Sequence, residues 1–202
     1  MRAIVYYCDW DKKTESHELL RLAISRYIGQ EINKITVCRR ADTDRSYPEE
    51  YLRRKGASEA AEREGQGKPY VKEMPEIHFS ISHSGDVWAC AVSDAEVGLD
   101  LQICHKGDGE KLARRFFHPS EIRWLEQHGF DAFSRLWAYK ESYVKYTGAG
   151  LKDGLDYFSV VDELPVMQRE IPFRDGFWMV LTGSSDAVCD SSLYCLEYKG
   201  KL

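Results

Sequence analysis

The stretch Trp137-Ala-Tyr-Lys-Glu-Ser-Tyr-Val-Lys145 places a large aromatic ring, a carboxylate and an amine at intervals of four residues. Apolar positions recur at helical spacing around it, which predicts a helix over residues 131–147. Residues four apart lie on one helix face, so Trp137, Glu141 and Lys145 are expected to project together. A helix that only packs against a core would carry Leu or Val there. The alternative is a weak Glu–Lys pair on a solvent-exposed face beside a half-buried tryptophan.

The strand predicted over residues 97–102 carries a second carboxylate in an unusual place. Its apolar residues alternate with Gly98, Asp100 and Gln102, so these three are expected on the face opposite the core. Aspartate is disfavoured inside strands, and a carboxylate among apolar neighbours is costly unless it is paired or binds a cation. Asp100 is therefore a candidate cation ligand. The alternative is a strand-end aspartate that makes hydrogen bonds within a turn.

A third polar group lies on the strand predicted over residues 77–84. Alternation places its isoleucines and Phe79 on one face and His78, Ser80 and Ser82 on the other. His83 and Ser84 follow at the strand end, where a turn begins. Several hydrogen-bond donors at one mouth would suit a phosphate, although a histidine at a strand end is commonly just a surface residue.

Helices and short strands are interspersed along the whole chain. Gly29, Gly129 and Gly148 are expected to end helices, and Asp131 is a candidate N-cap. Further helices are predicted over residues 16–28, 109–117 and 118–128. Further strands are predicted over residues 2–7, 35–39, 87–92, 157–161, 177–182 and 193–198. A polar Gly-Ser-Ser-Asp turn is expected between the last two. This order predicts an α+β fold with antiparallel strands rather than a parallel sheet. Residues 42–66 are strongly charged and are expected to be a solvated helix or a mobile excursion, either a lid or partner surface or a variable insertion.

Composition excludes several classes of function. The 202 residues carry a net charge of −5, from 28 basic and 33 acidic residues, which does not resemble the basic footprint of a nucleic-acid binder. No apolar run approaches the length of a membrane span, and the N-terminal run is too short for a signal peptide. The six cysteines show no metal-binding spacing and are expected to be reduced thiols. We expect a cytoplasmic protein with no nucleic-acid or membrane partner.

Five fragments, taken in this order and spacing, resemble the large, monomeric type of 4′-phosphopantetheinyl transferase that activates peptide and polyketide synthases. The resemblance runs from about residue 67 to 161 and is weak before it. The fragments are Gly67-Lys68-Pro69, Phe79-Ser-Ile-Ser-His-Ser84, Val97-Gly-Leu-Asp100, Phe117-His-Pro-Ser-Glu121 and Trp137–Lys145. The resemblance implies two similar α+β halves related by pseudo-two-fold symmetry, each a small antiparallel sheet packed on helices. We place the boundary so that residues 1–102 form the coenzyme A half, including the charged excursion, and residues 103–202 form the half with the metal-binding helix and the carrier docking surface.

The resemblance also implies a reaction. Magnesium and coenzyme A bind in the cleft between the halves, and the serine hydroxyl of a carrier protein attacks the phosphorus that bears pantetheine, releasing adenosine 3′,5′-bisphosphate. Asp100, Glu141 and Lys145 are the implied catalytic residues, because charge neutralisation and positioning dominate such reactions. Asp100, Glu141 and Gln102 are the implied metal ligands. Lys68, Ser82, His83 and Lys145 are implied to bind coenzyme A, with His83 near its 3′-phosphate, whereas Trp137 is expected to be mainly structural.

The chain departs from the family pattern in two places. Gln102 stands where the family often has a second acidic residue, so we expect magnesium binding weaker by about 1–2 kcal/mol, on the scale of a lost charged contact. Glu18 stands where a basic residue toward the 3′-phosphate is expected, although Lys12, Lys13 and His17 lie nearby. These departures leave open a non-catalytic relative that binds coenzyme A or a carrier protein. A magnesium-dependent phosphohydrolase is a third, more distant, hypothesis.

Carrier proteins of this family are usually acidic, and one segment of the chain offers a basic counterpart. Residues 103–123 combine basic side chains with two phenylalanines, and such a surface is a candidate docking site. The basic residues are Lys106, Lys111, Arg114, Arg115 and Arg123. The alternative is a solvated helix face.

Overall fold

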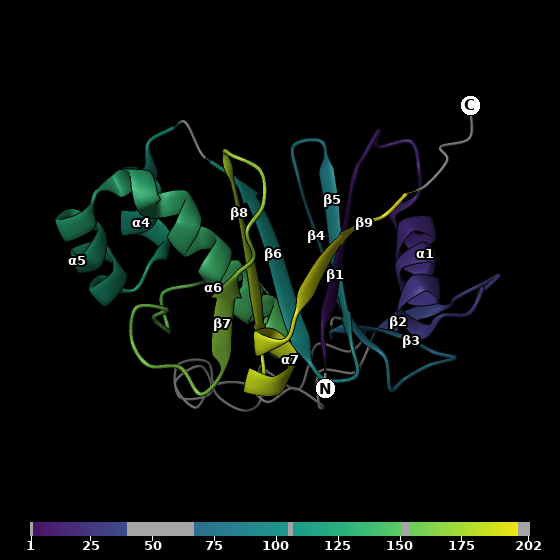
Figure 1. The fold of residues 1–202 in the computed structure, drawn as a ribbon. Helices are drawn as coiled ribbons and strands as arrows, with labels where there is room; N and C mark the ends of the chain where they lie inside the picture. The colour runs from purple at the N-terminus through teal and green to yellow at the C-terminus, as the bar shows by residue number, and fades with distance from the viewer. Residues whose placement is uncertain (1, 40–66, 105–106, 151–153, 198–202) are drawn as a thin grey trace.

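The computed structural model describes residues 2–39, 67–104, 107–150 and 154–197, and two β-sheets packed face to face form its centre (Figure 1). The core between them is built from small and branched side chains of both sheets, such as Val5, Ala89, Leu99 and Leu181. Helix α1 (Ser16–Ile28) covers the outer face of the first sheet, and helix α6 (Phe133–Thr147) covers the second. Strand alternation explains this arrangement, since each sheet must bury apolar side chains on both faces.

The first sheet has four strands in the order β4-β5-β1-β9. Their bounds are Ile4–Asp9 for β1, His78–Ser84 for β4, Val87–Ser93 for β5 and Ser192–Cys195 for β9. Neighbouring strands are antiparallel except β9, which pairs with β1 in parallel. The last described strand of the chain therefore returns to the sheet in which the first strand lies.

The second sheet has three antiparallel strands in the order β6-β8-β7. They are β6 (Val97–Ile103), β8 (Phe177–Gly183) and β7 (Met167–Glu170). A separate two-stranded sheet pairs β2 (Val37–Arg39) with β3 (Pro69–Val71). The predicted division between residues 102 and 103 stays a prediction, although strand pairing crosses it: β6 pairs with β8, and β1 pairs with β9.

A helical lobe lies at one end of α6, on the side away from α1 (Figure 1). It contains α4 (Gly109–Phe116), α5 (Pro119–His128) and a 3₁₀ turn, η2 (Phe130–Ala132); a short helix, α7 (Ser185–Cys189), follows β8. The side chain of His118 and that of Glu121 form a reciprocal capping box at the start of α5. Among the helices the structure describes, none is both long and apolar enough to cross a membrane.

Three serines of β4 join the two sheets along their neighbouring edges. The hydroxyl oxygens of Ser80, Ser82 and Ser84 accept hydrogen bonds from the backbone amides of Leu99, Leu101 and Ile103, at 2.9, 3.1 and 3.0 Å. The period of two along each strand keeps this serine ladder in register. The polar face predicted for β4 therefore faces the edge of β6.

Helix α6 lies directly on β6 at Gly98. A carbon atom added at Gly98 would lie 2.0 Å from the carbonyl oxygen of Ser142 and 2.4 Å from the amide nitrogen of Tyr146. No side chain fits between this helix and this strand. The contact sets the separation of the residues that flank Gly98 on β6 from those that flank Ser142 on α6.

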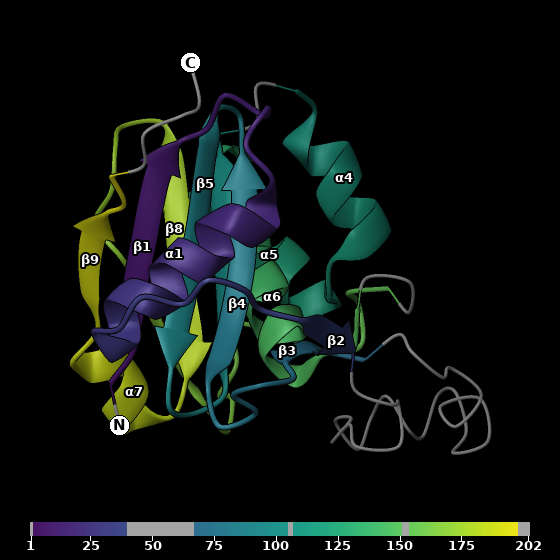
Figure 2. The ribbon, with the colours of Figure 1, turned by 90° about the vertical axis from the view of Figure 1, so that its right-hand side faces the viewer.

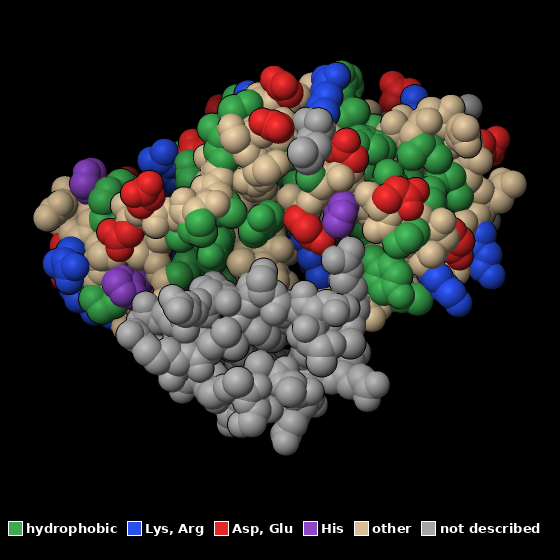
Figure 3. All heavy atoms as spheres, turned by 90° about the horizontal axis from the view of Figure 1, so that it is seen from below, with side chains coloured by type: hydrophobic (Ala, Val, Ile, Leu, Met, Phe, Trp, Pro, Cys, Tyr) green, Lys and Arg blue, Asp and Glu red, His purple; other side chains and the backbone are tan. Residues whose placement is uncertain are grey.

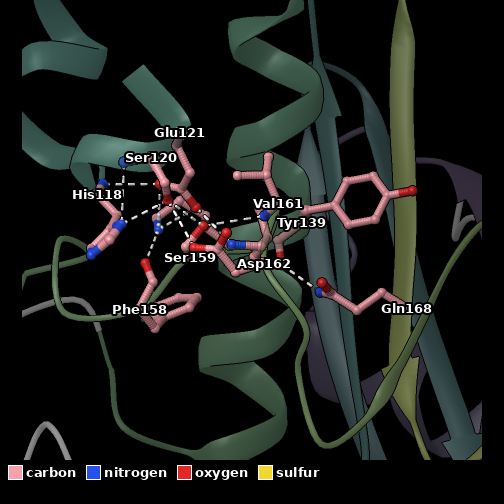
Figure 4. A network of polar contacts seen from close by, with 11 residues as sticks. His118, Ser120, Glu121, Tyr139, Phe158, Ser159, Val161, Asp162 and Gln168 are labelled. Atoms are coloured by element: carbon pink, nitrogen blue, oxygen red, sulfur yellow. Dashed lines mark hydrogen bonds and ion pairs between the residues drawn. The ribbon is translucent and has the colours of Figure 1, made fainter. Parts of the chain in front are cut away.

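A fully buried ion pair joins α6 to α5. Lys140 and Glu121 are both 0% exposed, and the Lys140 ammonium lies 2.7 Å from the Glu121 carboxylate and 2.8 Å from the carbonyl oxygen of Phe158 (Figure 4). Burial lowers the pKa of Lys140 to about 8, against the opposing effect of Glu121. The Glu121 carboxylate also accepts the backbone amides of His118 and Val160. Helix α5, its N-cap residue, helix α6 and the segment that contains Val160 therefore meet at one carboxylate.

Much of the predicted secondary structure is confirmed, including helix α1 with its stop at Gly29 and the alternation of β6. Four predictions are wrong. Asp131 lies within the 3₁₀ turn, and Ala132 is the N-cap of α6. Residues 157–161 form turns and bends rather than a strand, because amides of this segment bind the side chains of Glu121 and Ser159. The polar run after β8 begins α7, and β9 makes the first sheet mixed instead of purely antiparallel.

The excursion at 42–66 lies outside the described residues, and the internal two-fold symmetry stays a prediction.

Replacing Gly98 by alanine is expected to lower the free energy of unfolding by about 3 kcal/mol or more, because overpacking against backbone atoms cannot be relieved by a rotamer change. Urea unfolding followed by circular dichroism measures the loss. Gly29→Ala is the control: no described atom lies within 4 Å of its added carbon, and its φ of 71° alone costs about 1–2 kcal/mol. A smaller loss at Gly98 than at Gly29 would contradict the close contact.

Removing the charge of Glu121 is expected to be more damaging than removing an exposed carboxylate. Glu121→Gln leaves the buried Lys140 ammonium without its counter-ion, which costs about 3–5 kcal/mol in comparable cases. Glu110→Gln breaks the exposed pair with Arg114 and should cost less than about 1 kcal/mol. Equal losses in urea unfolding would mean that the buried pair does not hold α5 against α6.

Candidate functional site

A pocket of about 500 Å³ lies where α1, the β2–β3 pair, β4 and α6 meet. Figure 2 shows this side of the molecule, with β2 and β3 near one end of β4 and α6 beside it. Its apolar lining includes Leu20, Val37, Phe79, Ile81 and Val144. Its polar lining includes His17, Arg39, Lys68, Glu141 and Lys145. The pocket thus combines an apolar floor with several cations and one carboxylate, drawn from segments far apart in the sequence.

The Asp100 carboxylate lies beside the pocket and is held from one side only. Its Oδ1 accepts hydrogen bonds from Ser82 Oγ at 2.8 Å and from Lys145 Nζ at 2.7 Å. Lys145 Nζ also donates to Ser82 Oγ at 2.9 Å. Asp100 is 5% exposed, and its buried Oδ2 has no hydrogen-bond partner among the described residues. A buried carboxylate oxygen without a partner is costly, which indicates that a ligand completes the site.

Glu141 supplies the second carboxylate, from α6. It is 8% exposed. Burial and the charge of Asp100 together raise the pKa of Glu141 to about 7, against the opposing effect of Lys145. A cation would stabilise the ionised form of Glu141 beside the charge of Asp100, and oxygen ligands suit Mg²⁺. Asp100 and Glu141 therefore fit a divalent cation, whose remaining positions would go to water or to a bound phosphate.

Gln102, the third predicted metal ligand, makes a hydrogen bond to its own strand rather than to Asp100 or Glu141. The amide nitrogen of Gln102 donates to the backbone carbonyl of Ile103 at 3.0 Å, and the side chain is partly exposed at the end of β6. No group of three His, Cys, Asp or Glu side chains suited to a metal occurs in the described ranges. Gln102 keeps a free carbonyl oxygen in principle, and its role as a ligand stays a prediction.

Trp137 positions α6 and takes no part in the pocket. Its ring packs against Phe117 and Phe133, at centroid distances of 6.1 and 5.6 Å, and against the edge of Phe116. The structural role expected for Trp137 agrees with this packing. Of the three residues predicted to share a face, Glu141 and Lys145 reach the site, and Lys145 pairs with Asp100.

Lys68 lines the pocket and also makes hydrogen bonds to residues at the start of β6 and at the end of α6. Its ammonium donates to Glu96 at 2.5 Å and to the backbone carbonyls of Val97 at 2.7 Å and Tyr146 at 3.4 Å. Burial alone would raise the pKa of Glu96, but the hydrogen bond with His78 and the charge of Lys68 outweigh it and lower the value to about 2. Lys68 thus links β3 to β6 and to the last turn of α6.

The side chains of Ser82 and His83, predicted to act as a pair, lie on opposite faces of β4. Ser82 is buried against Asp100, whereas His83 is exposed on the other face of β4, where its ring lies 5.2 Å from that of Trp10. Successive side chains of a strand point to opposite faces, so the two cannot converge on one group from inside β4.

Two basic side chains of the pocket carry little or no signal in the sequence. Arg39 lines the pocket because β2 pairs with β3, with Arg39 opposite Pro69. His17, which the sequence marks only as a basic residue near the site, lines the pocket from the first turn of α1. The pairing of β2 with β3 spans the charged excursion, so no local pattern could have indicated it.

Comparisons with known proteins agree with this geometry. Residues 96–176 match the sequence model of the 4′-phosphopantetheinyl transferase superfamily. The chain is 42% identical over 98 residues to a 4′-phosphopantetheinyl transferase of Bacillus subtilis, covering 46% of this chain and 43% of that protein. It is 40% identical over 102 residues to the 4′-phosphopantetheinyl transferase psf-1 of Bacillus pumilus, covering 48% and 43%. It is also 40% identical over 89 residues to the 4′-phosphopantetheinyl transferase gsp of Aneurinibacillus migulanus, covering 42% and 36%.

The matched part of the chain spans less than half the length of these curated relatives. The matched superfamily region nevertheless contains β6 and all of α6, the two elements that supply both carboxylates and the amine of the site. Residues 96–176, with Asp100, Glu141 and Lys145 among them, are the part of the chain that matches the sequence model of the 4′-phosphopantetheinyl transferase superfamily.

Proposed function

We propose that this protein transfers 4′-phosphopantetheine from coenzyme A to a serine hydroxyl of an acyl or peptidyl carrier protein, with Mg²⁺, and releases adenosine 3′,5′-bisphosphate. One observation carries the proposal: in a superfamily segment, two buried carboxylates on different elements meet beside a pocket, and the Asp100 Oδ2 atom has no partner among the described residues. The curated relatives are named 4′-phosphopantetheinyl transferases, which supports the transfer of this group.

Each of three residues has a separate part in the proposed reaction. Asp100 and Glu141 hold the cation, which supplies positive charge to the pyrophosphate of coenzyme A. The ammonium of Lys145, at the same site, contacts the phosphates and stabilises charge that develops on the leaving oxygen. Glu141, with a pKa of about 7, accepts the proton of the carrier serine directly or through a water molecule.

The pocket has the chemistry that coenzyme A requires. Its apolar lining suits a heterocycle or the pantetheine arm, and Arg39, His17 and Lys68 supply positive charge for phosphates. Binding of coenzyme A by Lys68, Ser82 and His83 stays a prediction. Of these three, only Lys68 lines the pocket, and its ammonium already pairs with Glu96.

The basic docking surface proposed for an acidic carrier becomes narrower. Arg114 pairs with Glu110 and with Glu126, at 2.7 and 3.0 Å, so its charge is largely neutralised. Arg115 is exposed and lies over the ring of Phe116, which keeps a cation and an apolar surface together. On the face shown in Figure 3, basic and acidic side chains are interspersed with apolar ones. We therefore assign docking to Arg115 and its neighbour Lys111 rather than to Arg114; Lys106 lies outside the described residues.

A non-catalytic protein that binds coenzyme A or a carrier is the second candidate, favoured by Gln102 in place of a third acidic residue. Binding alone does not require Asp100, Glu141 and Lys145 together, and this favours the enzyme. The expectations of a monomer and of a cytoplasmic location stay predictions.

Incubation with coenzyme A, MgCl₂ and an apo carrier protein is expected to add the mass of one phosphopantetheine group to the carrier, measured by intact-protein mass spectrometry. Asp100→Asn and Glu141→Gln should slow this transfer by roughly 100-fold or more, as for other charge-stabilising groups. Glu163→Gln, an exposed carboxylate outside the pocket, is the control. Coenzyme A binding with no mass gain on several carriers would favour the non-catalytic candidate.

Glu141→Gln is also expected to change the dependence of stability on pH. Because burial raises the pKa of Glu141 to about 7 from an unfolded value near 4.5, the wild-type protein loses stability as pH rises between these values. Without metal, the variant should therefore melt at nearly the wild-type temperature at pH 4.5 and at a higher temperature at pH 8. Mg²⁺ at pH 8 should raise the melting temperature of the wild type only. The same melting-temperature difference at both pH values would contradict the raised pKa.

A further inference from the structure

We propose that Ser82 is a positioning residue that fixes the orientation of the Asp100 carboxylate, so that one oxygen is bound by Ser82 and Lys145 and the other is presented to the cation. The inference rests on the proposed function, because it concerns the cation site assigned there. It differs from the role that the family resemblance implied for Ser82, which was contact with coenzyme A. Ser82 is not among the residues that line the pocket. It is 5% exposed, and its hydroxyl group, on β4, contacts residues of β6 and α6.

The hydrogen bonds of Ser82 determine the direction of its hydroxyl proton. A hydroxyl group has one proton to donate and two lone pairs that accept. One lone pair accepts the amide of Leu101 at 3.1 Å, and the other accepts the ammonium of Lys145 at 2.9 Å. The proton is therefore left for Asp100 Oδ1, at 2.8 Å. Each hydrogen-bonding position of this hydroxyl has a partner.

This saturation matters because the terminal torsion of an aspartate is broad and roughly two-fold. Without a fixed donor, the plane of the Asp100 carboxylate could rotate away from the orientation that directs one oxygen toward a cation. Ser82 and Lys145 both bind Oδ1, so Oδ2 is the oxygen that stays without a partner among the described residues. Hydrogen bonds from neighbours that orient a metal ligand in this way commonly contribute about 10–100-fold to metal affinity.

The serine ladder supplies an internal control. The hydroxyl oxygen of Ser84 makes the same kind of contact with β6, since it accepts a hydrogen bond from the amide of Ile103 at 3.0 Å. Ser82 makes this contact and also reaches Asp100 and Lys145. Ser82→Ala and Ser84→Ala therefore remove the same bond between the sheets, but only Ser82→Ala removes a donor to the carboxylate.

The test measures Mn²⁺ binding to the full chain without coenzyme A, from the electron paramagnetic resonance signal of free Mn²⁺. Ser82→Ala should weaken Mn²⁺ binding by about 10-fold or more, and Ser84→Ala by less than about 2-fold. Both variants should unfold at lower urea concentration than the wild type, since each loses an acceptor for a β6 amide. Ser82→Cys, of similar size but a weak donor, should weaken Mn²⁺ binding like Ser82→Ala and serves if the alanine variant does not fold.

The outcomes separate the inference from the function on which it rests. Wild-type binding that is weakened equally by Ser82→Ala and Ser84→Ala would overturn the positioning role and leave the metal centre intact. Full Mn²⁺ affinity in Ser82→Cys would overturn it as well. A wild-type protein that binds no Mn²⁺ would overturn the metal centre itself, and the inference with it.

Discussion

The close contact of α6 with β6 at Gly98 is the constraint on which the site depends. Asp100 and Glu141 come from different elements, and neither element alone could bring two carboxylates together. Because no side chain separates the helix backbone from the strand, Asp100, two residues after Gly98, is held close enough to Glu141, just before Ser142, for its charge to raise the pKa of Glu141. The low exposure of both carboxylates, and with it the raised pKa of Glu141, follows from the same contact.

The far side of α6 is held by a different kind of chemistry. The aromatic rings around Trp137 and the buried pair of Lys140 and Glu121 fix the helix against the lobe of α4 and α5. A buried ion pair contributes little to net stability compared with apolar residues of the same volume, but it requires one geometry. Consecutive residues Lys140 and Glu141 thus have opposite surroundings: the Lys140 ammonium is neutralised by Glu121 inside the lobe, whereas the Glu141 carboxylate lies near the like charge of Asp100 and the amine of Lys145.

The local patterns of the sequence predicted what depends on local physics. The apolar stripe and terminal glycine of α1, and the alternation of β6 that separates Asp100 from the core, required no knowledge of distant residues. The partner of each polar group could not be predicted in the same way. Nothing in the local pattern indicates that the ammonium of Lys140 is buried against Glu121. The parallel pairing of β9 with β1, the position of Arg39 in the pocket and the hydrogen bonds of Ser82 all join residues far apart in the chain.

The serine ladder has a consequence for the edge of the second sheet that β6 forms. β6 is a terminal strand of that sheet, and the amides that it turns away from β8 could pair with a strand of another molecule. Three hydroxyl groups occupy these amides without extending the sheet, since a side chain offers an acceptor but no continuing backbone. The motif that holds the Asp100 carboxylate therefore also protects this edge from strand addition and aggregation, so selection for solubility would retain serines here independently of any role beside Asp100.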